Sequence, residues 1–290
     1  SAPRDCGAHR LLDTEEKCAM SFDPTLREPQ LSVFRDLIRQ GAGTLDKHDE
    51  QGAASPFVHA ARAYDALVER EVMRVNLHQR SLCQLLEAHV GPVDEVLDVG
   101  CGTGATTVAI ALSPGLKARR VIGVDPNGFS LRAAQARWAC YGSADNRVTF
   151  ERIASGKPLP YADESFGLTV CVSVLEYLGD SESRQVLAHE MLRVTRRGGS
   201  VCLVTPNPFR LFDYHTHRFL GDWRRTAGYP WASPPWALAQ LFRGHRVRFL
   251  LQEQLSHGLV KRQLPGARLL ARAAPLAWLL PWQKIIVNKV

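Results

Sequence analysis

Short apolar runs alternate with longer amphipathic stretches over most of the chain beyond residue 90. Runs rich in β-branched and aliphatic residues indicate buried strands, and apolar positions at helical spacing indicate helices. The pattern predicts strands at Glu95–Val99, Arg120–Val124, Val148–Ile153, Leu168–Val172, Ser200–Thr205, Val247–Leu251 and Lys284–Asn288. It predicts helices near Ala105–Leu112, Ser130–Tyr141, Ser181–Val194 and Trp236–Phe242. This alternation favours an α/β fold, a parallel sheet with helices on both faces.

The first 90 residues follow a different pattern. Residues 1–56 are interrupted by Pro24 and Pro29 and are expected to form a flap. Residues 57–90 place apolar side chains such as Val68, Val72 and Val75 near helical spacing, which predicts long helices. We therefore expect two regions, an N-terminal flap and helical cap at 1–90 and an α/β domain at 91–290.

A glycine-rich turn follows the first predicted strand of the α/β domain. Gly100, Gly102 and Gly104 stand at alternate positions between that strand and a helix. Glycine accepts positive φ and has no Cβ to hold a ligand away from the backbone. The turn is expected to present backbone N–H groups, with the positive end of a helix dipole behind them. Such a site suits a carboxylate, a ribose or a phosphate.

Two aspartates narrow the choice of ligand. The spacing Gly100-x-Gly102-x-x-Ala105 also matches the dinucleotide fingerprint, although that match alone is weak. Asp98 lies inside the strand before the glycines, where it can receive a cationic amino group. Asp125 ends the second strand, where an acid can accept both hydroxyls of a ribose. An amino group at one acid and a ribose at the other favour S-adenosylmethionine over a pyrophosphate.

Four segments in this order resemble the class I S-adenosylmethionine-dependent methyltransferases, of the small-molecule type similar to the enzymes of quinone biosynthesis. They are Leu97-Asp98-Val99-Gly100-Cys101-Gly102-Thr103-Gly104, Val121-Ile122-Gly123-Val124-Asp125-Pro126, the stretch from Leu159 to Glu176, and Leu192 to Ser200. The resemblance implies a Rossmann-like, mostly parallel sheet of seven strands whose last strand is antiparallel, and N-terminal helices that cover the cofactor.

The resemblance also implies S-adenosylmethionine as the cofactor and a set of residues that bind it. Pro126 would pack on the adenine, Ser155 stands where the family usually has an acid for the adenine amine, and Ser173 would meet the methionine end. The full expected cofactor site is Asp98, Gly100, Cys101, Gly102, Thr103, Gly104, Asp125, Pro126, Ser155 and Ser173.

A long connection without clear periodicity, residues 207–233, follows the fifth strand and is expected to be a substrate loop. It contains Asp213, His215 and His217. Three interpretations stay open for the histidines: a metal site, bonds to loop backbone, or a general base that removes the acceptor's proton. We take Asp213, His215 and His217 as the catalytic candidates, with His215 preferred and no metal. The same loop carries Arg218, Arg224 and Arg225, which suit an anionic acceptor.

Charge is distributed unevenly along the chain. Of 36 Lys and Arg and 29 Asp and Glu, residues 196–290 hold 15 and 3, a net +12, so residues 1–195 hold 21 and 26, a net −5. A basic C-terminal third suits an anionic substrate, nucleic acid, a membrane surface or simply a solvated face. The absence of an Asn/Asp-Pro-Pro-aromatic motif after the fourth strand argues against nucleic acid. Residues 256–283 are expected to form a helical insertion that packs over the sheet or lies on a membrane.

The sequence thus predicts a cytoplasmic methyltransferase, since no signal peptide, membrane span or paired cysteine pattern is visible. The expected reaction is methyl transfer to an oxygen or nitrogen of a small anionic molecule, such as a natural product, a saccharide or a lipid-linked intermediate. The alternatives are an NAD(P)-binding oxidoreductase and a non-catalytic scaffold that keeps the fold. No oligomeric state is indicated.

Overall fold

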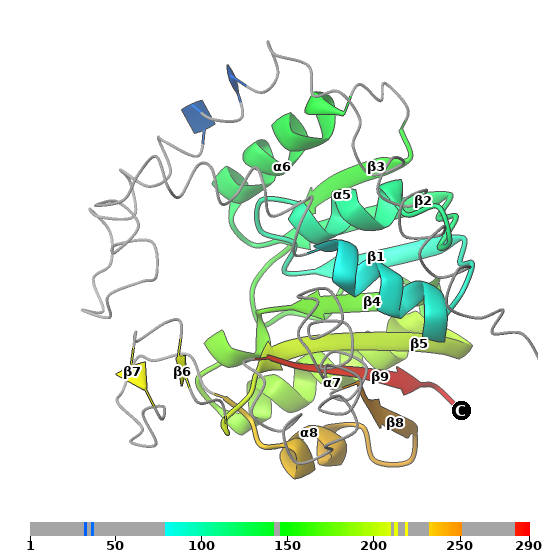
Figure 1. The fold of residues 1–290 in the computed structure, drawn as a ribbon, viewed down its shortest axis with the longest axis vertical. Helices are drawn as coiled ribbons and strands as arrows, with labels where there is room; N and C mark the ends of the chain where they lie inside the picture. The colour runs from blue at the N-terminus through cyan, green and yellow to red at the C-terminus, as the bar shows by residue number, and fades with distance from the viewer. Residues whose placement is uncertain are drawn as a thin grey trace, which may run out of the picture.

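A computed structural model describes residues 32–33, 36–37, 79–141, 146–209, 212–213, 218–219, 232–250 and 282–290. Seven strands form one sheet in the order β3-β2-β1-β4-β5-β9-β8, stacked from top to bottom in Figure 1. Their bounds are β1 Glu95–Val99, β2 Arg120–Asp125, β3 Val148–Arg152, β4 Phe166–Val172, β5 Thr195–Pro206, β8 Arg246–Phe249 and β9 Trp282–Asn288. The helices between them are α5 Ala105–Leu112, α6 Gly128–Cys140, the 3₁₀ turn η1 Leu175–Tyr177, α7 Ser181–Val194 and α8 Pro235–Leu241.

Strand direction confirms the expected topology. Strands β3, β2, β1, β4 and β5 pair in parallel, and β9 pairs antiparallel with both β5 and β8. The order reverses between β1 and β4, so the carboxyl ends of these two strands flank the switch point at which open α/β sheets bind ligands. The last strand, β9, pairs with β5 from Ser200 to Pro206.

Both faces of the sheet are buried, which is why the strands are almost continuously apolar. One face, with Val96, Val121 and Val170, packs against α5, against Trp138 of α6 and against helical residues 79–89. The other face, with Leu97 and Ile285, packs against α7 and α8. Alternate side chains of each strand therefore enter two separate cores. The predicted helices on both faces are confirmed.

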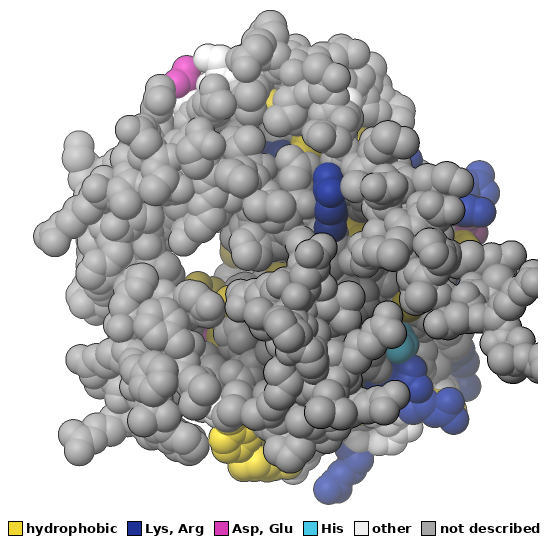
Figure 2. Space-filling view, in the orientation of Figure 1, with side chains coloured by type: hydrophobic (Ala, Val, Ile, Leu, Met, Phe, Trp, Pro, Cys, Tyr) yellow, Lys and Arg dark blue, Asp and Glu magenta, His cyan; other side chains and the backbone are white. Residues whose placement is uncertain are grey.

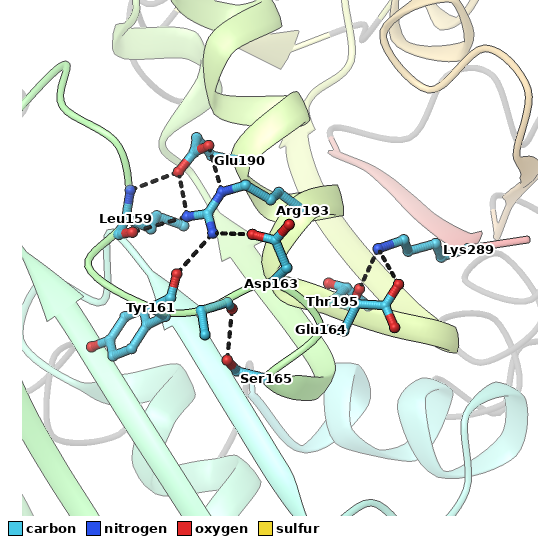
Figure 3. Close-up of polar contacts among 10 residues, drawn as sticks. Leu159, Tyr161, Asp163, Glu164, Ser165, Glu190, Arg193, Thr195 and Lys289 are labelled. Atoms are coloured by element: carbon cyan, nitrogen blue, oxygen red, sulfur yellow. Dashed lines mark hydrogen bonds and ion pairs between the residues drawn. The ribbon is translucent and has the colours of Figure 1, made fainter.

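Arg193 of α7 fixes the connection between β3 and β4 (Figure 3). Its guanidinium donates to the carbonyl oxygens of Leu159 at 2.9 Å and Tyr161 at 2.8 Å, and to Asp163 at 2.8 Å. Glu190, one helical turn earlier, accepts from Arg193 and from the Leu159 N–H, the latter at 2.7 Å. The hydrogen bond from Arg193 is the main reason why the pKa of Glu190 lies below its ordinary value. This network closes a connection that has no regular backbone pairing of its own.

One edge strand of the sheet, β8, carries exposed arginines. Strand β8 lies at one edge with Arg246 and Arg248 exposed, and Arg248 contacts the His89 ring at 3.0 Å. Figure 2 shows the Lys and Arg side chains that gather on this side of the molecule. Charged side chains on an edge strand oppose pairing with another chain. Among the described residues, no helix is long and apolar enough to cross a bilayer.

The predicted N-terminal cap lies almost wholly outside the described residues. Of the region 1–90, the structure describes residues 32–33 and 36–37, which are helical, and residues 79–90, of which 79–89 are helical. The predicted insertion at 256–283 also lies outside them, except for Trp282 and Gln283, which belong to β9 rather than to a helix. Five of the seven cysteines are described, and none of these five forms a disulfide.

Candidate functional site

The glycine turn lies at the carboxyl edge of the sheet and is fastened to the neighbouring strand. The N–H groups of Gly100 and Cys101 both donate to the Val124 carbonyl of β2, at 2.8 and 3.0 Å. The N–H of Gly104 donates back to the Cys101 carbonyl at 2.9 Å and closes the turn before α5 begins. The turn therefore has a fixed shape, in which the chain passes from β1 into the helix within five residues.

The three glycines of the turn all have positive φ, but the space around a Cβ added at each of them differs. Gly100, Gly102 and Gly104 have φ values of 72°, 51° and 77°. A Cβ on Gly100 would overlap the Val174 side chain, and one on Gly104 would come within 2.8 Å of Ala134. A Cβ on Gly102 would meet nothing within 4 Å. Gly100 and Gly104 thus allow close packing of the fold, whereas Gly102 has open space above it for a ligand.

Asp125, at the end of β2, joins the glycine turn to the start of α6. One carboxylate oxygen accepts from the Gly102 N–H at 3.0 Å, and the other accepts from the Asn127 N–H at 2.8 Å. Asn127 in turn caps α6 by accepting from Phe129 and Ser130. Each carboxylate oxygen has a second lone pair, so both can still accept a hydrogen bond from a ligand. The half-buried carboxylate is oriented to receive two neighbouring hydroxyl groups beside Gly102.

Asp98 is a buried acid, with 1% of its surface exposed. The hydroxyl of Thr107, in the first turn of α5, donates to it at 2.6 Å. Burial raises the pKa of Asp98 to about 7, and the Thr107 hydrogen bond offsets part of that rise. The nearby charge of Asp125 adds to it. A buried carboxylate that is costly to ionise by itself ionises more readily when a cationic group lies beside it.

The exit from β4 completes the edge of the site. Ser173 has a φ of 57°, a left-handed conformation that costs energy for a residue with a side chain. Its N–H donates to the Val204 carbonyl of β5 at 2.9 Å, which holds the strained residue in place. Val174, the next residue, lies against Gly100. The strain at Ser173 turns the chain at the point where the exits of β1 and β4 meet.

Three other predicted cofactor residues lie around this edge. Cys101 is buried, and burial raises the pKa of its thiol well above the ordinary value, so the thiol is not a nucleophile. Pro126 is exposed next to Asp125, and its carbonyl accepts from Arg152 at 3.1 Å. Ser155 is exposed in the turn after β3. Pro126 and Ser155 both lie after strand ends at this edge of the sheet, and their roles stay predictions.

Of the three predicted catalytic residues, only Asp213 lies among the described residues, and only its backbone is described. Asp213 belongs to β6, Phe212–Asp213, which pairs antiparallel with β7, Arg218–Phe219. This register places Asp213 opposite Arg218. His215 and His217 lie outside the described residues, as do Arg224 and Arg225. Among the residues that are described, no group of three or more His, Cys, Asp or Glu could hold a metal ion.

Sequence reasoning missed three residues of this site, namely Thr107, Val174 and Arg137. Arg137 of α6 is 2% exposed, and its Nε donates to the Thr103 carbonyl at 2.7 Å. A signal was present in the sequence, because Leu131, Ala134 and Trp138 have helical spacing and Arg137 falls on the same buried stripe. An arginine on an apolar helix face indicates a specific polar partner in the interior.

The described residues fit a nucleoside that carries an amino acid. Asp125 and Gly102 suit a ribose, exposed Pro126 suits the flat base, and Asp98 suits an ammonium group. A dinucleotide pyrophosphate fits less well, since the glycine turn has two aspartates close to it and like charges repel.

Comparison with known proteins points in the same direction. Residues 96–199 match a family model described as a methyltransferase domain. This interval begins in β1 and ends in β5, so it contains the glycine turn, Asp125 and Ser173.

Curated relatives match the same part of the chain. An O-methyltransferase, resE, of Aspergillus sclerotiorum is 31% identical over 170 residues, which are 55% of this chain and 60% of the relative. Ajmaline N-methyltransferase of Rauvolfia serpentina is 27% identical over 125 residues, 43% of this chain and 37% of the relative. Methyltransferase GfsG of Streptomyces halstedii is 33% identical over 109 residues, 38% of this chain and 36% of the relative. The chain thus spans 60% or less of each of these proteins.

Solved structures with related folds include a SAM-dependent methyltransferase from Aquifex aeolicus. It has a TM-score of 0.48 and 14% identity, and the alignment covers 72% of this chain and 89% of the other. The [4+2]-cyclase SpnF aligns with a TM-score of 0.47 and 20% identity, over 73% of this chain and 80% of the other.

Proposed function

Residues 96–199 form a domain of the class I S-adenosylmethionine-dependent methyltransferase family, and on that premise we propose that the protein transfers the methyl group of S-adenosylmethionine to a small-molecule acceptor. The observation that carries the proposal is Asp125, whose carboxylate bridges the Gly102 N–H and the start of α6 beside open space. When bound, the sulfonium supplies an activated methyl group, so the protein needs mainly to bind and align the two reactants.

Each described residue has a defined part in this proposal. Asp125 accepts hydrogen bonds from the two ribose hydroxyls, and Asp98 accepts one from the amino group. Ser173 and the glycine turn follow the carboxyl ends of β4 and β1, which are neighbours in the sheet. The buried walls around Asp98 exclude water from the amino-acid end. None of these groups has to exchange a proton with the acceptor, which agrees with a reaction that depends on alignment.

Titration calorimetry with S-adenosylhomocysteine and with NAD(P)H tests this proposal directly. We expect binding of the first in the micromolar range and none of the second. Asp125→Ala should weaken S-adenosylhomocysteine binding about tenfold or more, because hydrogen bonds to a charged acceptor are lost. Binding of NAD(P)H alone would favour the oxidoreductase. Absence of binding to either nucleotide would favour the non-catalytic scaffold.

We propose an oxygen or nitrogen of a small anionic molecule as the methyl acceptor. The relatives include an O-methyltransferase and an N-methyltransferase, which supports both atoms. The net charge of +12 in residues 196–290 supports an anionic acceptor such as a natural product, a saccharide or a lipid-linked intermediate. Incubation of the protein with S-adenosylmethionine and candidate acceptors, followed by mass spectrometry for a methylated product, would identify the class.

His215 is the proposed general base. Imidazole titrates near neutral pH, and the β6–β7 pair brings the ends of the segment that contains His215 together. His215→Ala should lower turnover by about tenfold or more, since a positioned base contributes on the order of 10²–10⁴-fold. His217→Ala is the matched control two residues away. Unchanged turnover in His215→Ala with reduced turnover in His217→Ala would transfer the role to His217.

Contact with an anionic membrane surface is a further proposal for the basic C-terminal third. Arg246 and Arg248 of β8 are exposed at the sheet edge, and Arg243 lies just before them. Sedimentation with vesicles of phosphatidylglycerol should remove the protein from solution at low salt and not at high salt, because exposed charges are screened. Neutral phosphatidylcholine vesicles are the control. Equal sedimentation with both would contradict an electrostatic contact.

A further inference from the structure

A buried arginine lies directly behind the glycine turn. Arg137 comes from the last turn of α6, 34 residues after Thr103 in sequence. Its Nε donates to the Thr103 carbonyl at 2.7 Å, and its Nη2 donates to the Thr103 hydroxyl at 3.2 Å. The side chain is 2% exposed and is the largest of the fully buried side chains among the described residues. Both contacts are made to one residue of the turn, by two nitrogens of the planar guanidinium.

The position of Thr103 explains why such a contact matters. Thr103 stands between Gly102 and Gly104, both with positive φ, and glycines allow the peptides on either side to rotate at little cost. The peptide between Thr103 and Gly104 is held at both ends, since the Gly104 N–H donates to Cys101 while the Thr103 carbonyl accepts from Arg137. This leaves one orientation for the part of the turn that borders the open space at Gly102.

Burying a guanidinium is costly, and its hydrogen bonds to Thr103 offset part of that cost. The neighbours of Arg137 on the buried stripe of α6 are Ala133, Ala134 and Trp138, where an apolar side chain would pack. A long apolar residue in place of a buried charge is often neutral or stabilising. The charge also lies beside backbone N–H groups at the start of α5, where a carboxylate is favoured.

We infer that Arg137 is a positioning residue for the methyl donor, which acts through Thr103 on the amino-acid end of the ligand. This inference rests on the proposed function. Along the turn, Gly102 bonds to Asp125 on the ribose side, and α5 provides Thr107, which bonds to Asp98 on the amino-acid side. Thr103 lies between these two points, next to Gly104, the N-cap of α5. Thr103 leads directly into α5, whose first turn holds the Thr107 partner of Asp98. We therefore expect a change at Thr103 to alter the binding of the amino-acid end more than the binding of the nucleoside.

The test compares two ligands in three variants. S-Adenosylhomocysteine carries the amino acid, and 5′-methylthioadenosine lacks it. Arg137→Met removes both hydrogen bonds at similar length, and Arg137→Lys keeps the charge without the planar fork. Arg132→Met is the matched control, because Arg132 is on the same helix, is exposed and stacks on Phe129 at 5.4 Å. All four proteins are measured by titration calorimetry and thermal unfolding.

We expect Arg137→Met to raise the Kd for S-adenosylhomocysteine about tenfold or more, with less than about a threefold change for 5′-methylthioadenosine. Arg137→Lys should lie between Arg137→Met and the wild type, and Arg132→Met should match the wild type. A purely structural role would lower the melting temperature and leave the ratio of the two Kd values unchanged, which would overturn the inference. Should Arg137→Met fail to fold, the ratio measured in Arg137→Lys decides. Failure of the wild type to bind S-adenosylhomocysteine would instead refute the proposed function.

Discussion

Replacing Asp98 with asparagine should raise the free energy of unfolding at neutral and higher pH, and it should lower the affinity for S-adenosylhomocysteine. Asp98 is 1% exposed, and burial raises its pKa from 3.8 to about 7. Asparagine has nearly the same shape, carries no charge and keeps an oxygen that can accept from the Thr107 hydroxyl. The substitution therefore removes the cost of ionising a buried acid without creating a cavity.

The sign and size of the effect follow from proton binding. The folded wild type holds a proton on Asp98 up to about pH 7, whereas the unfolded chain loses it near pH 3.8. The native state binds more protons in this window, so its stability falls as pH rises from about 4 to about 7. One pKa unit corresponds to about 1.36 kcal/mol, so a rise of about 3 units corresponds to about 4 kcal/mol in full. Between pH 5 and pH 8 the stability of Asp98→Asn relative to the wild type should increase by about 2.5 kcal/mol.

Urea unfolding of both proteins at several pH values measures this difference. The other titrating groups are common to the two proteins and cancel in the comparison. Thr107→Val provides a control, because it removes the hydrogen bond to Asp98 and leaves the acid in place. A constant stability difference between Asp98→Asn and the wild type from pH 5 to pH 8 would refute the reasoning about the buried charge.

Ligand binding should change in the opposite direction. An ammonium group beside Asp98 favours the ionised acid, so wild-type affinity for S-adenosylhomocysteine should rise with pH through about 7. At pH 8, Asp98→Asn should raise the Kd for S-adenosylhomocysteine about tenfold or more, since a charged hydrogen bond is lost. A variant that is more stable but binds less well would show that the acid is present for the ligand. Unchanged affinity would place the amino group elsewhere.

Two further predictions concern the turn and the network at α7. Gly102→Ala should lower the free energy of unfolding by about 1–2 kcal/mol, because the left-handed backbone strain is its only cost. Gly100→Ala should cost more, because its Cβ would also overlap Val174. Equal costs of the two substitutions in urea unfolding would contradict this packing argument. Arg193→Met should destabilise the fold by about 2–4 kcal/mol, since its partners would lose charged hydrogen bonds. Arg197→Met is its control, because the Arg197 side chain is 80% exposed and pairs with Glu164 at 3.4 Å, a contact worth less than about 1 kcal/mol. Similar midpoints for both arginine variants would exclude Arg193 as the closure of the β3–β4 connection.

Local pattern was enough to find most of the sheet. Strands buried on both faces are apolar at nearly every position, so β1, β2 and β4 were found within one or two residues of their ends. Strand β5 was predicted to begin at Ser200, but it begins at Thr195. The prediction missed the start because Arg196 to Gly199 are polar or lack a side chain. Thr195 pairs with Phe166 on β4 and the pairing resumes at Ser200 with Leu168, so the strand begins before an irregular stretch that periodicity cannot reveal.

The glycine turn and its two aspartates were also visible in sequence, because they are close together along the chain or end a predicted strand. The pair β6 and β7 was not predicted, since two-residue strands are too short to show alternation. The contact of Val174 with Gly100 was not visible either, because it joins the exits of two strands that only the sheet order makes neighbours.

The sequence by itself determined the class of fold, the likeness of residues 96–199 to a methyltransferase domain, and the glycine turn after the first strand. Only the tertiary structure decided that Asp98 is buried enough to have a pKa of about 7, and that Arg137 reaches Thr103 from α6. The physical reason is the distance along the chain between the residues that set each property. Strand pattern and glycine conformation are properties of a few consecutive residues, whereas burial and side-chain partners depend on elements that the chain brings together from afar.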